Sequence, residues 1–209
     1  MTLYTKRERF ASLSVKVGIA FSKLRLSPNM WTMISLIPIL ISLYFLLKSN
    51  FLLAAIFFII SAFLDIVDGS VARVTGRVSK FGAYLDTVVD RYVEAIIIFA
   101  LLFAALPVIT IPYLPAIPIA AWLYLYFFGS IMTTYVKAAA KEKEIIGQGN
   151  ELKGGLLERA DRMILLFIGI LAAVYDPLFL SGMVILLAVL SNVSALQRIW
   201  KARKLATSP

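Results

Sequence analysis

The chain has 209 residues, of which 61% are hydrophobic and only 16% charged, and its mean hydropathy of +0.89 excludes an ordinary soluble domain. It contains neither cysteine nor histidine, which excludes disulfides, thiol catalysis and Cys- or His-based metal sites. A net charge of +9 could indicate nucleic-acid binding, but no basic face is interleaved with exposed aromatic residues. We therefore expect a membrane protein without nucleic-acid partners, whose metal ligands and general bases are carboxylates suited to hard cations.

The first 27 residues predict an amphipathic helix that lies in the membrane interface. Phe10, Leu13, Val17 and Phe21 recur at helical spacing, and lysines and arginines lie between them. Ser27-Pro28-Asn29 then interrupts this helix and precedes an uncharged run. The segment is too charged for a signal peptide, so we expect the mature protein to retain it.

Six apolar segments follow, each of a length that can cross the hydrocarbon core of a bilayer. They are expected at residues 31–47, 51–74, 80–105, 119–140, 156–175 and 177–197. The predicted fold is all-α, with six transmembrane helices preceded by the interfacial helix. We expect residues 1–209 to form a single domain, in which 1–27 are the interfacial helix and 31–198 are a six-helix membrane bundle.

The distribution of lysine and arginine predicts the orientation of this bundle. Residues 1–30 carry six of them, 73–80 three, 137–162 six and the tail from Arg198 to Lys204 four. Lys48 is the only one assigned to the opposite side. By the positive-inside rule, both termini and both polar loops face the cytoplasm, and we expect a multi-pass protein of the plasma membrane.

Four aspartates mark the candidate site. Asp65 and Asp68 are three residues apart on one predicted helix, and Asp86 and Asp90 are four apart on the next. Each spacing places a pair on one helical face, and a short loop makes the two helices antiparallel neighbours. Four carboxylates that converge would repel one another, and bound cations relieve that repulsion. The pattern predicts one or two divalent metal ions, and two would suit an in-line displacement at phosphorus.

A structural alternative is that these acids form salt bridges with Arg73, Arg77 and Arg91. It accounts for two or three of the charges but not for the small residues around them. Those small residues, which allow a ligand or a neighbouring backbone to approach closely, are Gly69, Ala72 and Gly82.

The spacing of these residues resembles the signature of the CDP-alcohol phosphatidyltransferase family. The pattern consists of Asp65, Asp68, Gly69, Ala72, Arg73, Gly82, Asp86 and Asp90. All eight positions match over 26 residues, and the six-span layout with its leading helix is also similar to that family. The similarity therefore extends over nearly the whole chain.

The resemblance implies an enzyme that transfers a phosphoalcohol group from a CDP-linked lipid to an alcohol and releases CMP. It implies that CDP lies near Asp65, Asp68, Gly69, Ala72, Arg73 and Gly82. It also implies that Asp65, Asp68 and Asp86 coordinate Mg²⁺ or Mn²⁺. Asp90 would either share that coordination or be the catalytic general base. A homodimer is compatible with the family, although no feature of the sequence indicates one.

A second group of charges predicts the acceptor. Arg159 and Arg162 share a helical face, and Lys137 is expected near the same membrane surface. Together they could bind a phosphorylated acceptor, or they could be a cytoplasmic basic cluster whose side chains reach the headgroups. Residues 158–162 resemble the family branch that accepts inositol phosphate, so inositol 1-phosphate is the expected acceptor. Glycerol phosphate or another alcohol is the alternative.

Two other functions compete with this interpretation. An intramembrane prenyltransferase also holds metal and diphosphate with aspartates, but usually in two stretches from different halves of the chain. A cation transporter would need acids along a path, whereas the later spans contribute no buried acid that would continue one.

Overall fold

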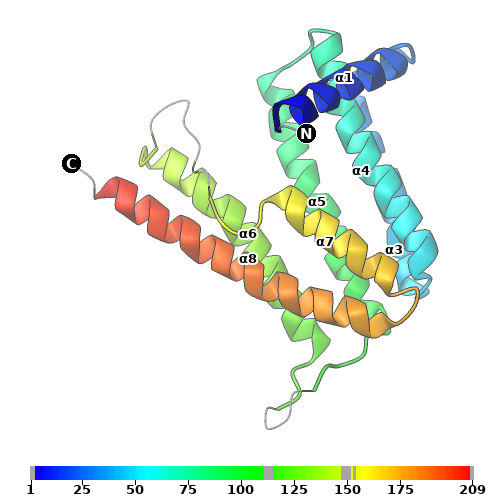
Figure 1. Ribbon diagram of the computed structural model, residues 1–209, viewed down its shortest axis with the longest axis vertical. Helices are drawn as coiled ribbons and strands as arrows, with labels where there is room; N and C mark the ends of the chain where they lie inside the picture. The colour runs from blue at the N-terminus through cyan, green and yellow to red at the C-terminus, as the bar shows by residue number, and fades with distance from the viewer. Residues whose placement is uncertain (1–2, 111–114, 147–151, 153, 208–209) are drawn as a thin grey trace. The chain divides into compact units, whose positions relative to one another are not determined.

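The computed structural model describes residues 3–110, 115–146, 152 and 154–207, with side chains described from residue 12 onward. All regular structure in these residues is helical, as predicted (Figure 1). The basic and aromatic side chains from Lys6 to Phe10 and the loop glycines Gly147 and Gly149 lie outside the described residues. Two compact units make up the chain: residues Met1–Phe45 with Leu53–Ile97, and residues Leu46–Leu52 with Ile98–Pro209.

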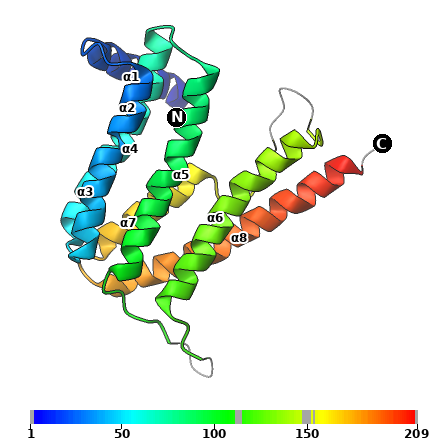
Figure 2. The same ribbon diagram turned by 180° about the vertical axis from the view of Figure 1, so that it is seen from behind.

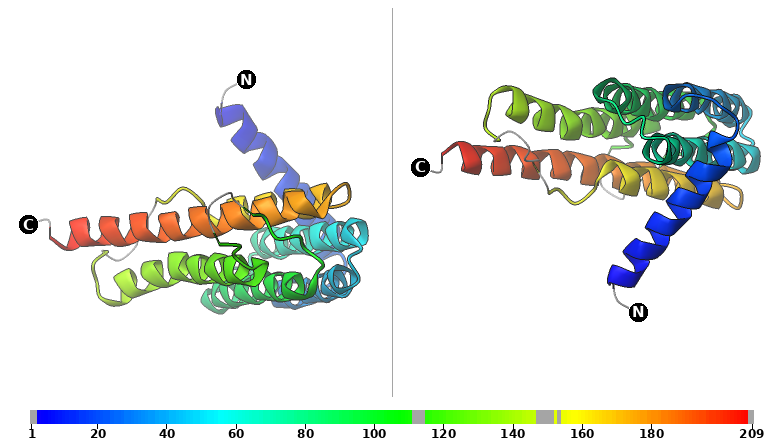
Figure 3. Two further views of the ribbon diagram at one scale, coloured as in Figure 1. Left: turned by 90° about the horizontal axis from the view of Figure 1, so that it is seen from below. Right: turned by 90° about the horizontal axis from the view of Figure 1, so that it is seen from above.

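The first unit contains the N-terminal helices and most of the fifth. Its helices are α1 (Leu3–Ser22), α2 (Pro28–Ile34), α3 (Leu36–Leu47), α4 (Phe51–Val74) and α5 (Lys80–Phe103). In the views of Figure 3 the other helices of this unit are seen nearly end-on, whereas α1 is seen from the side. Helix α1 therefore runs across them. Trp31, Val67 and Val71 form a buried cluster against which Val17 and Phe21 of α1 pack. The edge-to-face contact of Phe21 with Trp31, at 5.3 Å between ring centroids, fastens α1 to α2.

The first predicted span is two helices rather than one. Ser27 accepts a hydrogen bond from the Met30 N–H, and Pro28 follows at the first helical position, which explains why α2 begins there. The break falls at Ser35, whose hydroxyl donates to the Thr32 carbonyl. Ser61 of α4 donates to the Ser35 carbonyl at 2.8 Å, so the interruption leaves that buried acceptor paired.

The second unit is built around α6 (Ile119–Glu142), α7 (Arg159–Ala172) and α8 (Pro177–Ala206). Helices α6 and α8 lie side by side (Figures 1 and 2). Gly129 makes this possible, because a Cβ there would lie 2.8 Å from the backbone nitrogen of Asn192. The Asn192 amide donates to the Leu125 carbonyl at 2.8 Å and links the two helices.

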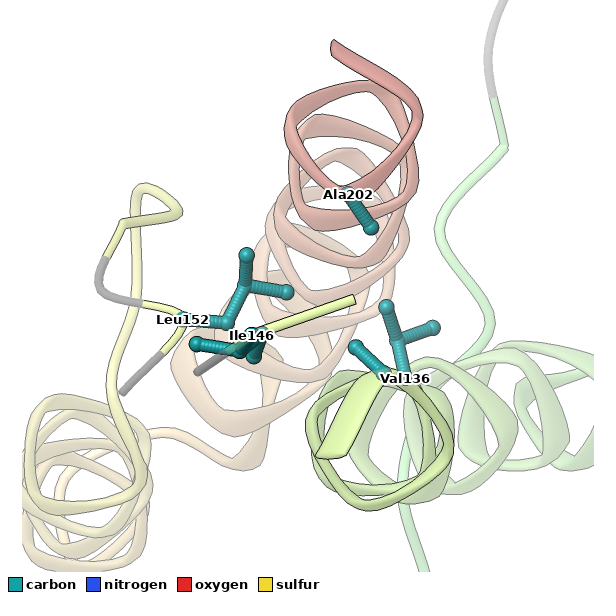
Figure 4. Packing of buried hydrophobic residues seen from close by; sticks show 5 residues of the cluster. Val136, Ile146, Leu152 and Ala202 are labelled. Atoms are coloured by element: carbon teal, nitrogen blue, oxygen red, sulfur yellow. The ribbon is translucent and has the colours of Figure 1, made fainter. Parts of the chain in front are cut away.

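An apolar cluster packs between the C-terminal ends of α6 and α8. Val136 of α6 and Ala202 of α8 face Ile146 and Leu152 of the connecting segment (Figure 4). The sequence predicted that the last helix ends near residue 197 and that a basic tail follows. That boundary is wrong: α8 continues to Ala206, because the residues after 197 are good helix formers and neither Gly nor Pro interrupts them.

Four of the described segments are long and apolar enough to cross a membrane: Pro28–Leu47, Phe51–Val74, Ile119–Glu142 and Pro177–Ala206. Helices α5 and α7 occupy the other two predicted positions. α5 carries several charges in its first half, and α7 has only 14 residues, since it begins at Arg159 instead of residue 156. The chain is thus an all-helical, multi-pass membrane protein, and its six-span count stays a prediction.

Candidate active site

Three of the four predicted aspartates converge at the junction of α4 and α5. Asp65 and Asp68 project from α4 and Asp86 from α5, and one carboxylate oxygen of each lies within 4.8 Å of the others. This confirms the expectation that the two helices are neighbours and that their acidic faces meet. Asp90 lies one turn further along α5, outside the group of three. Carboxylate oxygens so close together are a ligand set for a hard divalent cation.

The orientation of one member of this group is fixed from α2. Asp68 is buried, with 6% of its surface exposed, and its Oδ2 accepts a hydrogen bond of 2.5 Å from the Thr32 hydroxyl. A hydrogen bond to a ligating carboxylate holds it in one rotamer, which is a common feature of metal sites. Sequence analysis missed Thr32, because the residue lies 36 positions from Asp68 and carries no charge.

A pocket of about 340 Å³ opens beside the aspartates. Its walls come from the start of α2, the end of α4, the turn and the start of α5, and most of the predicted CDP-binding residues line it. The lining residues are Pro28, Asn29, Thr32, Asp68, Gly69, Ala72, Arg73, Arg77, Val78, Ser79, Gly82, Ala83 and Asp86. A volume of this size suits a small-molecule ligand.

The glycines of the motif keep this pocket open. A Cβ on Gly82 would lie 3.1 Å from Ser79 Oγ and 3.2 Å from Asn29 Oδ1. A Cβ on Gly69 would lie 3.4 Å from Nη1 of Arg73. The Cβ position at Gly82 is thus tight, whereas the one at Gly69 would make an ordinary contact. Gly82 leaves space next to polar side chains, which agrees with the predicted approach of a flat or charged ligand. Asn29 and Ser79 were not predicted as residues of the site. Ser79 could have been recognised as a helix cap, because a serine before a helix often is one. In the structure its Oγ accepts from the Gly82 N–H at 3.0 Å.

Two arginines of the first unit, Arg73 and Arg91, have partners outside the group of three aspartates. Arg91 Nη1 forms a 2.8 Å ion pair with Glu94, which is buried and three residues away on α5. Arg73 Nη2 donates to the Ser14 hydroxyl at 2.8 Å. Arg73 and Arg91 are thus each held by a group other than the three clustered aspartates.

A second polar cluster lies in the other unit, between α6, α7 and α8. Oε2 of Glu158 is 3.2 Å from Nζ of Lys137, and its Oε1 is 3.2 Å from Nη2 of Arg198. The Arg198 guanidinium is buried and also donates to the carbonyls of Thr133 and Gly154 at 2.7 Å each. Sequence analysis missed Arg198 because it counted this residue in the basic tail, whereas the continuation of α8 buries it.

The two other predicted acceptor residues differ in their surroundings. Arg162 is only 1% exposed and donates to the hydroxyls of Ser130 and Thr133, at 3.1 and 3.3 Å. Arg159, on the first turn of α7, is half-buried. A buried arginine held by two hydroxyls does not extend toward the headgroups, so Arg162 is no part of an exposed basic cluster.

Residues 25–202 match the model of the CDP-alcohol phosphatidyltransferase family, and the chain belongs to that family. It is therefore a transferase, as the motif predicted, and neither a prenyltransferase nor a cation transporter. The archaetidylinositol phosphate synthase of Pyrococcus horikoshii is 33% identical over 191 residues, which cover 90% of each chain.

Two solved structures of the Mycobacterium tuberculosis phosphatidylinositol phosphate synthase share the fold. The structure with bound CDP-DAG superposes with a TM-score of 0.77 at 23% identity and covers 95% of this chain and 96% of its own. The structure with manganese and citrate gives a TM-score of 0.78 at 23% identity, covering 94% and 90%. The helical arrangement is thus that of a known membrane transferase.

Proposed function

We propose that this protein transfers the phosphoalcohol group of a CDP-linked lipid to a hydroxyl of inositol 1-phosphate and releases CMP. The observation that carries the proposal is the convergence of Asp65, Asp68 and Asp86 beside a pocket lined by the other residues of the motif. The name of the Pyrococcus relative, an archaetidylinositol phosphate synthase, supports inositol phosphate as the acceptor.

The donor binds in the pocket of the first unit. Gly69, Ala72 and Gly82 admit the CDP moiety, and the Arg73 guanidinium donates hydrogen bonds to its diphosphate oxygens. The three clustered carboxylates, whose oxygens lie within 4.8 Å of one another, fit one or two Mg²⁺ or Mn²⁺ ions. When bound, such ions neutralise the charge that develops on the diphosphate oxygens.

Asp90 is the general base in this proposal. It lies one helical turn from Asp86, close to the metal-binding group but not within it. Its carboxylate accepts the proton of the acceptor hydroxyl, and the acceptor oxygen then bonds to the phosphorus that bears the lipid alcohol. The bond from that phosphorus to CMP breaks, and CMP leaves. In a chain without histidine or cysteine, a carboxylate is the strongest base available at neutral pH.

The acceptor phosphate binds to the basic groups of the second unit. The proposed ligands are Lys137, Arg159 and Arg162. Arg198 is added to them because it shares the Glu158 carboxylate with Lys137, with N–O distances of 3.2 Å, and cations that hold one carboxylate can bind a phosphate in its place. Arg162 also donates to the hydroxyls of Ser130 and Thr133. Glycerol phosphate would satisfy the same cations, and it is the second candidate acceptor.

The membrane placement follows the charge asymmetry of the sequence. We propose that the aspartates face the cytoplasm of the plasma membrane and that α1 lies in its interface. Leu13, Val15 and Ile19 of α1 are exposed, alongside Lys16, as expected for a helix that contacts both acyl chains and anionic headgroups.

The test is release of CMP by the purified protein, supplied with a CDP-linked lipid, Mg²⁺ or Mn²⁺, and a panel of acceptors. Release with inositol 1-phosphate, and not with serine or glycerol, supports the proposal. Release only with glycerol phosphate or an uncharged alcohol overturns the acceptor but not the reaction.

One variant distinguishes a role of Asp90 as general base from a role in binding CDP. Asp90→Asn should lower kcat by about 10²–10⁴-fold, the usual contribution of a general base, while the Kd for CDP stays within about twofold. Asp65→Asn serves as the comparison, since it should weaken metal-dependent CDP binding itself. Normal turnover in Asp90→Asn would refute the assignment of the base.

A further inference from the structure

Helix α1 crosses α4 at a point where no side chain of α1 separates the two backbones. Gly18 is buried there, and a Cβ on it would lie 2.5 Å from the Ser70 carbonyl oxygen and 2.6 Å from Cγ2 of Val74. Both distances are below what any carbon–oxygen or carbon–carbon contact tolerates. Only glycine allows α1 to approach this closely, so the crossing sets the register of α1 on α4.

Ser14 lies one turn before Gly18 and hence on the same face of α1. Its Oγ is 2.8 Å from Oγ of Ser70 and 2.8 Å from Nη2 of Arg73. The guanidinium can only donate, and the Ser70 hydroxyl donates to the Ile66 carbonyl at 2.8 Å. Ser14 therefore accepts from Arg73 and donates to Ser70. The four groups form a chain of hydrogen bonds in which every hydroxyl proton has an acceptor.

This chain restrains the one arginine of the motif. Arg73 is exposed and lines the pocket, and a long side chain in that position would otherwise sample many rotamers. With Nη2 bonded to Ser14, Nη1 lies beside Gly69, where an added Cβ would be 3.4 Å away. A donor group that is fixed before its ligand arrives loses less conformational entropy on binding.

We propose that Ser14 is a positioning residue for the transfer reaction: it holds the Arg73 guanidinium in the orientation that binds the diphosphate of the CDP-linked donor. The N-terminal helix is thus part of the donor site and not only a membrane anchor. Ser14 precedes residues 25–202 of the family match and the 65–90 motif, so neither assigns it a role. The inference rests on the proposed function, because it takes Arg73 to be the ligand of the diphosphate.

Binding of CDP to the purified protein in the presence of Mn²⁺, measured by calorimetry, tests this inference. Ser14→Ala should weaken CDP binding by about fivefold, the net effect of one lost hydrogen bond of ordinary strength, and raise the KM for the CDP-linked lipid with little change in kcat. Ser14→Thr, which keeps the hydroxyl, should restore binding. The matched control is Ser22→Ala on the same helix, since Ser22 donates only to the Ile19 carbonyl within α1.

Two further variants separate positioning from general damage to the fold. Gly18→Ala should lift α1 from α4 and reproduce the loss of CDP binding seen in Ser14→Ala. In an Arg73→Ala background, Ser14→Ala should have no additional effect, because Ser14 acts through that guanidinium. Thermal unfolding of every variant shows whether the helices remain assembled.

The outcomes are distinct. Unchanged CDP binding in Ser14→Ala, equal loss in Ser22→Ala, or an undiminished effect of Ser14→Ala without Arg73 would each overturn the inference. If the wild-type protein neither binds CDP nor releases CMP, it is the proposed function that fails instead.

Discussion

If the acceptor phosphate binds Lys137 and Arg198 as proposed, Glu158 competes with it for those cations, and removal of its charge should tighten acceptor binding. Its carboxylate contacts both Lys137 and Arg198, each at 3.2 Å. A phosphate that binds the same two cations must displace it or share them. Glu158→Gln keeps the size of the side chain and removes its charge. Glu158 and Asp161 form a capping box at the start of α7, in which Asp161 accepts from the backbone N–H of residue 158 at 2.9 Å and the Glu158 side chain accepts from the backbone N–H of residue 161. Glutamine keeps a side-chain oxygen that can accept this second hydrogen bond, so the start of α7 should be preserved.

The expected magnitude follows from the exposure of the three side chains. Glu158 is 53% exposed and Lys137 33%, so solvent screens their pair, and such pairs are worth about 0.2–1 kcal/mol. Arg198 is 3% exposed, which places its pair toward the upper end of that range. Loss of both contacts amounts to about 1 kcal/mol, and this corresponds to about a fivefold change in affinity.

The assay is CMP release at saturating CDP-linked lipid with inositol 1-phosphate varied. Glu158→Gln should lower the KM for inositol 1-phosphate by about fivefold and leave the KM for the donor unchanged. Glu142→Gln is the matched control, because it removes the same charge from an exposed pair with Lys143 that touches neither Lys137 nor Arg198. Added salt should reduce the difference between variant and wild type.

A higher KM in Glu158→Gln would refute this reasoning. It would mean that Glu158 holds the two cations in place for the acceptor, and that its ordering effect exceeds its competition with the phosphate. An unchanged KM would show that the acceptor binds elsewhere and would remove Lys137 and Arg198 from the proposed pocket.

Three further substitutions test other parts of the structure. Thr32→Val removes the hydrogen bond to Asp68 and should raise the Mn²⁺ concentration for half-maximal CMP release about tenfold; an unchanged requirement would contradict the role of Thr32. Gly82→Val should abolish CDP binding without lowering the thermal midpoint, and retained binding would show that CDP lies outside this pocket. Gly129→Leu should destabilise the protein by about 1–3 kcal/mol, because its side chain meets the backbone of Asn192; an equal midpoint in thermal unfolding would be inconsistent with that crossing.

The site of the aspartates could be predicted almost completely from the chain. Residues three or four apart on a helix share a face whatever surrounds them, and a short turn makes consecutive helices neighbours. These local rules were sufficient to bring Asp65, Asp68 and Asp86 together, and the structure confirms that they converge. The same rules place Asp90 on that face but do not decide its role, which depends on distances of a few ångströms.

Contacts between distant segments needed the folded chain. Ser14 and Arg73 are 59 residues apart, and Thr32 and Asp68 are 36 apart. No periodicity links such pairs, and serine and threonine are too common in helices to be noticed alone. The basic residues show the same limit. The sequence marked Lys137, Arg159 and Arg162 for the acceptor, but only the folded chain shows that Arg198 and Lys137 share a common partner, Glu158.

Composition and helical period therefore determine that this is a helical membrane protein with an acidic site between two consecutive helices, because each depends only on neighbours in the chain. The resemblance of the motif to its family implied the transferase. The crossing of α1 over α4 and the partners of each arginine were decided by tertiary packing. They depend on how closely the helix backbones approach each other at Gly18 and Gly129. That distance is set by the surfaces of both helices, so it cannot be read from the sequence of either one alone.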